Sequence, residues 1–271
     1  MDQQSSVPPA LDAATVVLLR DGVQGLEVYL MRRVAAMRFA PGMYVFPGGR
    51  VEDRDYGDVP VSGAPDLRGA SGDAVLARAL TVCAARETFE ETGVLITTPS
   101  AVANESSRTE IESGGDFASL LRGLSARVDA RALPMWAHWV TPEIESKRFD
   151  VRFYVAAVPA GQSVRDVSGE ADHVRWIRPA DALALHAAGE LPMLPPTSAT
   201  LADLEVFGSA AAAVAHAVHR TVEPLLPHRA ADGRWSIIHA YDRSVIHPVT
   251  EARIISEVAG VRRTGPGGVS A

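Results

Sequence analysis

The sequence predicts an α/β or α+β fold with a mainly helical C-terminal extension. Short β-rich runs alternate with amphipathic or alanine-rich segments, as in folds that pack helices against a sheet. The chain has 271 residues, of which 47% are hydrophobic and 22% charged, so it can bury a sizeable core. Beyond residue 195 the sequence becomes alanine-rich and is punctuated by prolines. We therefore expect a mixed core over 10–194, the extension over 195–260 and a flexible tail over 261–271.

The first third of the chain predicts a hairpin followed by a glycine turn and a loop. Two β-rich runs, 15–19 and 26–31, lie on either side of the turn signal Asp21-Gly22. A short apolar run then ends at Pro47-Gly48-Gly49, where glycine permits unusual backbone angles. Residues 56–72 are rich in glycine, proline, serine and aspartate without periodicity, which predicts a loop.

A long helix is expected next. Asp73 can cap its N-terminus, and Gly93 follows Thr92 at a position typical of a helix C-terminus. The later elements that we expect are a strand at 94–96, a short amphipathic helix over 116–128, strands at 136–140, 149–155 and 172–177, a helix from Pro179, a helix over 198–220 and a strand at 235–240.

Charge and composition argue against several classes of function. The net charge is −7, and Lys147 is the only lysine among 26 basic residues, so the chain is a poor match for a polyanion. No helix-turn-helix with a basic face stands out. A single cysteine, a start without secretory-signal character and no apolar run of about 20 residues are typical of a reducing compartment. We expect a cytoplasmic protein with neither nucleic acid nor membrane as a partner.

Three glutamates on the expected helix are the residues that indicate a chemical function. Glu87, Glu90 and Glu91 are spaced i, i+3 and i+4, so in a helix they share one stripe with β-carbons about 5–6 Å apart. The same stripe continues upstream through Leu76, Leu80, Cys83 and Ala84, while Val75, Val82 and Phe89 form a second apolar side. A helix that is apolar on both sides belongs to an inner layer, which places the glutamates in a cleft.

Three neighbouring carboxylates repel one another unless a cation is present. All-oxygen ligation favours Mg²⁺ or Mn²⁺ over zinc, and such ions share their coordination shell with substrate phosphates. The pattern therefore indicates metal-assisted hydrolysis of a phosphate ester or diphosphate. An acidic helix face held in ion pairs by Arg86 is the competing interpretation of the glutamates taken alone.

Two segments together resemble the Nudix box, G-x5-E-x7-R-E-U-x-E-E-x-G-U, where U is a bulky apolar residue. Gly49 resembles its opening, and Arg86-Glu87-Thr88-Phe89-Glu90-Glu91-Thr92-Gly93-Val94 resembles its close, with an interruption of 23 residues between them. Counting forward from Gly49 places the middle acid on Asp55, whereas counting back from Arg86 places Arg78 there. We prefer the forward count because Pro47-Gly48-Gly49 has the strand-turn context. Thr88 also departs from the pattern, which has a bulkier apolar residue at that position.

The interrupted box, with Trp139-Val140-Thr141-Pro142 and Lys147-Arg148-Phe149-Asp150 downstream, is similar to a Nudix branch that includes coenzyme A diphosphatases. The resemblance implies a Nudix-like α/β/α sandwich with a mixed central sheet. It also implies metal ligation by Glu87, Glu90, Glu91, the Gly49 carbonyl and a further acid, for which Glu170 is the first candidate and Asp172 the second. Arg86 would hold the glutamates in place, and one of the glutamates, Glu170 included, would act as the general base. An ordinary loop acid is the competing interpretation of Glu170.

The branch implies coenzyme A or acyl-coenzyme A as the substrate, cleaved to 3′-phospho-AMP and (acyl-)4′-phosphopantetheine. Its extra phosphate calls for a further cation, for which the candidates are Arg32, Arg33, Arg38 and Arg148, while Trp139 or Trp136 could stack on the base. A Nudix pyrophosphatase for NADH, ADP-ribose or a nucleotide sugar is the alternative enzyme, and a catalytically silent nucleotide sensor is the alternative of another class. A homodimer formed through 195–260 is compatible with each.

Overall fold

The computed structural model describes residues 7–34, 40–164, 171–229 and 235–242. In these ranges nine strands form a mixed sheet in the order β10-β2-β1-β9-β8-β11-β12, with β3 paired to β2 and β4 paired to β1. The strands are β1 (Ala10–Gly22), β2 (Gly25–Arg33), β3 (Tyr44–Val45), β4 (Gly48–Arg50), β8 (Met135–Val140), β9 (Arg148–Ala157), β10 (Ala171–Ile177), β11 (Pro224–Arg229) and β12 (Trp235–His239). The pairs β1·β9 and β8·β11 are parallel, and the others are antiparallel.

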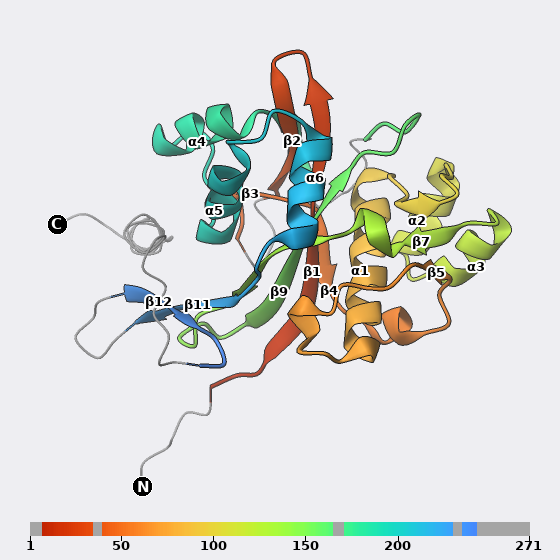
Figure 1. Cartoon of the computed structure of the whole chain (residues 1–271), viewed down its shortest axis with the longest axis horizontal. Helices are drawn as coiled ribbons and strands as arrows, with labels where there is room; N and C mark the ends of the chain where they lie inside the picture. The colour runs from red at the N-terminus through yellow and green to blue at the C-terminus, as the bar shows by residue number, and fades with distance from the viewer. Residues whose placement is uncertain (1–6, 35–39, 165–170, 230–234, 243–271) are drawn as a thin grey trace, which may run out of the picture.

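Helices cover both faces of this sheet (Figure 1). They are α1 (Ala74–Thr92), α2 (Glu105–Glu112), α3 (Phe117–Gly123), α4 (Pro179–Ala187), α5 (Pro195–Leu204) and α6 (Ala210–His219). Helix α1 lies on one face, whereas α4, α5 and α6 contribute to a separate core on the other. The predicted α/β/α sandwich with a mixed central sheet is confirmed.

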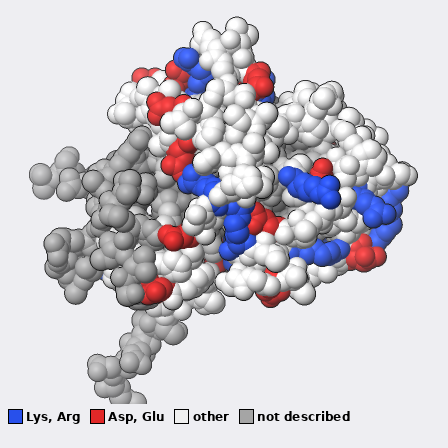
Figure 2. All heavy atoms as spheres, in the orientation of Figure 1, with Lys and Arg blue, Asp and Glu red and all other residues white. Residues whose placement is uncertain are grey.

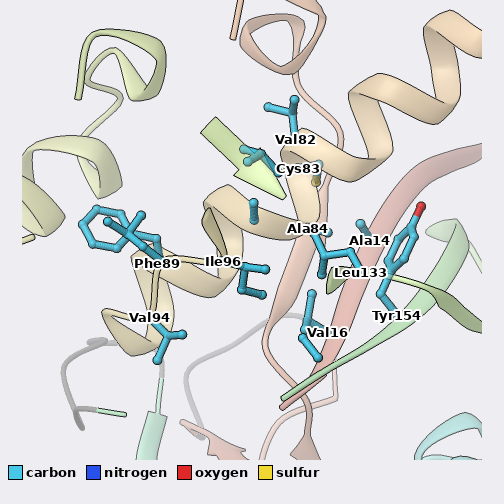
Figure 3. Close-up of a cluster of buried hydrophobic side chains, with 14 of the residues drawn as sticks. Ala14, Val16, Val82, Cys83, Ala84, Phe89, Val94, Ile96, Leu133 and Tyr154 are labelled. Atoms are coloured by element: carbon cyan, nitrogen blue, oxygen red, sulfur yellow. The ribbon is translucent and has the colours of Figure 1, made fainter. Parts of the chain in front are cut away.

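Because side chains along each strand point alternately to the two faces of the sheet, the protein has a hydrophobic core on each face. In β1, Ala14, Val16 and Leu18 face α1, while Val17 and Leu19 face the other side, as expected for a period of two. Figure 3 shows the α1 core, where Ala84 lies toward Ala14 of β1 and Tyr154 of β9, whereas Phe89 lies on the other side of the helix and stacks on Phe117 of α3. Fully burying one such aliphatic or aromatic side chain stabilises the fold by about 1.5–3 kcal/mol. Helix α1 is therefore an inner-layer helix, as its sequence predicts.

The expected hairpin is confirmed, and its strands are longer than the β-rich runs alone suggest. Strands β1 and β2 pair from Leu19↔Val28 to Gly22↔Gly25. Gly25 has a φ of 114°, which L side chains rarely adopt. The turn lies two residues later than Asp21-Gly22, at Val23-Gln24, because Asp21 and Gly22 are still paired with β2.

Hydrogen bonds connect the segment that interrupts the box to two other parts of the fold. This segment follows the 3₁₀ turn at Asp53–Tyr56 and contains strand β5 (Val61–Ser62) and a second 3₁₀ turn at Arg68–Ala70, and β5 joins a small sheet with β7 (Arg127–Asp129) and β6 (Thr97–Thr98). The Arg68 guanidinium donates to the Ala217 carbonyl at the end of α6 (3.0 Å), and the Asp66 carboxylate accepts from the Met135 N–H of β8 (3.1 Å). The interruption thus links the neighbourhood of α1 to the opposite face of the sheet.

Three expectations about local structure are wrong in detail. The strand expected at 94–96 forms later, at Thr97–Thr98, because the Gln162 side-chain amide hydrogen-bonds both backbone groups of Leu95. The helix expected over 116–128 ends at Gly123 and is followed by β7. The single helix expected over 198–220 is two helices, because the chain turns at 205–209 and Ser209 caps α6 by accepting from the Ala212 N–H.

The region after residue 195 is continuous with the core in space. Helices α5 and α6 pack into the core around β1, β8 and β9, and β11 pairs with β8. The strand expected at 235–240 is present as β12. The boundary at 194/195 stays a prediction. Among the described residues, no helix combines the length and the apolar character needed to cross a bilayer.

Candidate active site

A cavity of about 510 Å³ brings the Nudix-like segments together with β8, β9 and the start of α5. Its acidic end is formed by Glu87, Glu90, Glu91 and Glu112, beside Gly48, Gly49 and Arg50 of β4. The rest is mainly apolar and is lined by Val45, Phe46, Trp139, Val140, Pro142, Phe149, Val151, Phe153, Leu194, Pro195, Pro196 and Pro227. The cavity is therefore amphipathic, with a cluster of four glutamates at one end and mainly aromatic and aliphatic groups across the remainder, together with Arg33, Glu145 and Lys147.

Capping fixes the helix that carries the glutamates. The Asp73 carboxylate accepts hydrogen bonds from the Val75 and Leu76 N–H groups, 2.9 and 3.1 Å away. At the other end Gly93 adopts a φ of 73° and its N–H donates to the Phe89 carbonyl. Both predicted ends of the helix are confirmed. The glutamates consequently lie in its last two turns, at the cavity.

Arg86 is the buried centre of the acidic cluster. Its guanidinium makes two 2.8 Å hydrogen bonds to the Asp55 carboxylate, and both side chains are essentially inaccessible. It also donates to Glu87 (2.8 Å) and Glu90 (3.2 Å). Burial opposes the charge, but the hydrogen bonds to Asp55 and the charge of Glu87 raise the pKa of Arg86 above its ordinary value. Asp55, the residue found by the forward count, is thus the acid that orients Arg86.

The two glycines of β4 permit close packing, Gly49 against Glu87 and Gly48 against the backbone of β1. A Cβ on Gly49 would come within 2.4 Å of the Glu87 carboxylate. A Cβ on Gly48, whose φ is 156°, would come within 2.4 Å of the Ala14 carbonyl oxygen. The Gly48 N–H donates to the Glu91 carboxylate at 2.7 Å. The turn predicted from Pro47-Gly48-Gly49 therefore packs directly against the glutamate stripe.

Burial strongly perturbs Glu90, which has only one of its two oxygens in a hydrogen bond. One oxygen accepts from Arg86, and the other lies 3.1 Å from Arg54 without hydrogen-bond geometry. Burial raises the pKa of Glu90 to about 7, against the opposing charge of Arg86. Burial also raises the pKa of Glu87, which Arg86 partly offsets. A cation near these carboxylates would remove this cost of charge burial.

The donor chemistry of the cluster suits a hard divalent ion, although its arrangement is one of ion pairs. Among the described residues, no three His, Cys, Asp or Glu side chains surround a point where an ion would fit. The glutamates contact Arg86, Arg54 and the Gly48 N–H, and the Gly49 carbonyl lies 3.6 Å from the Cys83 thiol. The ligands are all oxygen, however, and Glu90 Oε1 is buried without a hydrogen bond. The residues therefore fit such an ion chemically, and the ligand set stays a prediction.

The structure brings some of the candidate substrate residues to the cavity and leaves others away from it. Arg33 and Trp139 line it. Arg32 does not, and pairs instead with Asp172 at 2.7 Å across the β2–β10 edge. Arg148 is buried and donates to the Thr141 and Pro8 carbonyls, so it fastens the start of β9. Arg38 and Glu170 lie outside the described residues.

Several cavity residues were not among the candidates. Lys147, Arg50 and Glu112 supply charge, and Phe149 supplies a ring. The alternation of side chains along β9 could have predicted that Phe149, Val151 and Phe153 share one face of the strand. No local pattern predicts Glu112 at the cavity, because it comes from α2. Trp136, considered for base stacking, is fully buried against Phe207.

Comparison with known proteins places this geometry in a family. The profile of the NUDT19 Nudix domain matches residues 68–204. Acyl-coenzyme A diphosphatase NUDT19 of Xenopus laevis is 24% identical over 217 residues, covering 63% of this chain and 57% of the relative. The Homo sapiens protein of that name is also 24% identical, covering 69% of this chain and 62% of the relative. The chain thus spans little more than half the length of these relatives.

A solved structure agrees with the sequence comparison. The crystal structure of a NUDIX hydrolase from Alicyclobacillus acidocaldarius superposes with a TM-score of 0.66 and 29% identity, covering 78% of this chain and 97% of that one. The profile match spans just over half of the 271 residues and includes the helix that carries the three glutamates. The chain belongs to the Nudix hydrolase family, in its NUDT19 branch.

Proposed function

We propose that the protein is a divalent-metal-dependent diphosphohydrolase that cleaves coenzyme A or acyl-coenzyme A to 3′-phospho-AMP and (acyl-)4′-phosphopantetheine. The observation that carries this proposal is the amphipathic cavity, in which the glutamates adjoin a long apolar wall. A diphosphate would lie at the acidic end, and the wall would accommodate the less polar parts of the substrate. The relatives named acyl-coenzyme A diphosphatase support the choice of conjugate.

The proposed metal ligands are Glu87, Glu90 and Glu91 with the Gly49 carbonyl, and Glu170 is retained as a further candidate. When bound, Mg²⁺ or Mn²⁺ would neutralise phosphate charge and acidify the attacking water. Arg86, fixed by Asp55, holds Glu87 and Glu90 at the cavity. A glutamate of this set accepts the proton of the water. Arg86 is therefore a positioning residue, because it contacts the carboxylates from their buried side.

Product identification tests the proposal directly. The full chain is incubated with Mg²⁺ or Mn²⁺ and, separately, with coenzyme A, an acyl-coenzyme A, NADH and ADP-ribose, and the products are identified by mass. We expect 3′-phospho-AMP and (acyl-)4′-phosphopantetheine, and no turnover in EDTA. Turnover of NADH or ADP-ribose without turnover of coenzyme A would overturn the choice of substrate. Binding without turnover in any metal would indicate a sensor and overturn the enzymatic function.

A further inference from the structure

We propose that Lys147 is a specificity-determining residue that binds a phosphomonoester on the ribose of the substrate, at the far end of the cavity from the glutamates. The proposal rests on the proposed function, because it assumes that a nucleoside-diphosphate conjugate occupies this cavity. One arrangement of groups supports the proposal. The exposed ammonium group of Lys147 lies at the mouth of the cavity, beside aromatic side chains that line the cavity toward the carboxylates.

Sheet register shows how the two ends of the cavity are related. Thr15 of β1 pairs with Gly48 of β4 on one side and with Phe153 of β9 on the other. In turn β9 pairs with β8, where Val151 opposes Trp139. Three strand spacings separate β4 from β8, which is about 14 Å at roughly 4.8 Å per spacing. A ligand that reaches from the glutamates to Trp139 must therefore be extended across the sheet.

Lys147 lies at the end of the aromatic surface of the cavity, where such an extended ligand would reach the solvent. It directly precedes β9, is exposed and lines the cavity, and its ammonium lies 5.1 Å from the centre of the Phe149 ring. This cation–π contact holds the charge at the aromatic surface. Within the described part of the chain, Lys147 makes no ion pair with a carboxylate. Its ammonium is consequently available to an anionic ligand, and a compact point charge is well suited to phosphate.

The other cations near the cavity are less suited to this role. Arg50 lies beside Gly49 at the acidic end and is 3.6 Å from Glu52. Arg33 enters from β2, which lies on the opposite side of β1 from β9 and β8. Arg32 and Arg148 are engaged away from the cavity. In the described ranges this leaves Lys147 as the cation on the β8–β9 side of the cavity.

The aromatic and proline surface beside Lys147 indicates which part of the substrate lies there. Phe149, Trp139 and Pro142 offer flat apolar groups next to one positive charge. A purine base packs against such surfaces, and a phosphate on its ribose would lie beside the base at the polar mouth. The nucleoside half therefore extends along β8 and β9, with its extra phosphate at Lys147.

Matched substrates that differ by one phosphate test this assignment. The kcat/KM values of the full chain, Lys147→Gln and Lys147→Arg are measured for coenzyme A against dephospho-coenzyme A, and for NADPH against NADH. The Lys147→Gln variant should lower kcat/KM roughly tenfold for the phosphorylated member of a pair and less than twofold for the other. The Lys147→Arg variant should retain most of the preference. Arg131→Gln, which removes an exposed charge away from the cavity, should change neither.

Equilibrium binding separates failure of this inference from failure of the proposed function. The same variants are titrated with 3′-phospho-AMP and with AMP, which requires no turnover. Preference for 3′-phospho-AMP that is lost in Lys147→Gln supports the inference, even if no diphosphate is hydrolysed. An unchanged ratio between the two ligands, or between the paired substrates, in folded Lys147→Gln overturns the inference whether or not coenzyme A is a substrate.

Discussion

The two ends of the cavity are built on different physical principles. The acidic end is made mainly by one capped helix and a glycine turn, and Glu87 and Glu90 are cross-linked there by the buried Arg86, which Asp55 orients. The β8–β9 end is made by strand termini and a loop, and its charge is carried by an exposed lysine on an aromatic ring. Rigid, pre-organised charge suits chemistry, whereas an adaptable point charge suits recognition.

One face of the molecule can be compared with the two ends of the cavity, and it repeats neither arrangement. On the face shown in Figure 2, acidic and basic side chains are interspersed among uncharged ones. The excess of acids over bases, 33 against 26, therefore says little about the site. Electrostatic complementarity to a phosphate conjugate must arise inside the cavity, where dielectric screening is weaker.

The largest effect is expected at the acidic end. Glu90→Gln and Glu91→Gln should each lower kcat by about 10² to 10⁴, because each removes an oxygen anion proposed to hold the metal or the proton of the water. The matched control is Glu110→Gln, an exposed position on α2 that does not line the cavity. Metal-dependent turnover and thermal unfolding are measured together. A folded Glu90→Gln or Glu91→Gln variant with full turnover would contradict the site assignment.

Breaking the buried pair should be the next largest effect and should appear in stability as well. Asp55→Asn leaves the inaccessible Arg86 charge without its bidentate partner, at a cost of about 3–5 kcal/mol in the free energy of unfolding. Asp53→Asn, an exposed change in the same turn, is the control. Urea denaturation at pH 7 measures both variants. A loss below about 1 kcal/mol in Asp55→Asn would show that the cluster is not organised around this pair.

The two ends of the cavity also differ in how much of their structure could be predicted from the sequence. The hairpin, the capped helix and the glutamate stripe depend on local signals, namely Asp73, Gly93 and the spacing of Glu87, Glu90 and Glu91. These features are present as predicted. Asp55 could be chosen only by counting from the glycine turn, and its pairing with Arg86 spans 31 residues.

The β8–β9 end could not be predicted in this way. Arg32 and Arg148 were reasonable cations by their position on strands, but their partners, Asp172 and the Pro8 carbonyl, each come from 140 residues away. Lys147 belongs to a segment that resembles the branch, but no local pattern marks it as a ligand-binding cation, and its place at the cavity depends on the parallel pairing of β1 with β9. Contacts between residues far apart in the sequence decide which cation is available to a ligand. The periodicity of the sequence does not encode these contacts.

Acid should weaken the link between the box interruption and β8, which the Asp66 carboxylate makes by accepting from the Met135 N–H. Although burial opposes it, hydrogen bonds from Arg68 and from the Met135 N–H lower the pKa of Asp66 in the folded protein. A carboxyl group whose pKa is lower in the folded state contributes stability above its unfolded pKa and loses it as the pH falls through the folded value. Asp66→Asn should therefore cost about 1–2 kcal/mol at pH 7 and progressively less below about pH 4. Urea titrations of both proteins across this range measure the difference, and a constant difference would refute the linkage.

The smallest effect should come from the acid that lies near Lys147. Glu145 lines the same cavity, and its carboxylate would repel a phosphate held at Lys147. Glu145→Gln should therefore raise the kcat/KM ratio of coenzyme A to dephospho-coenzyme A by about twofold to threefold, the scale of a solvent-screened pair. The gain should disappear in the Glu145→Gln, Lys147→Gln double variant, because both charges act on the same group. An equal gain in the double variant would mean that Glu145 acts on the phosphate independently of Lys147, and an unchanged ratio in Glu145→Gln would mean that Glu145 does not act on this phosphate.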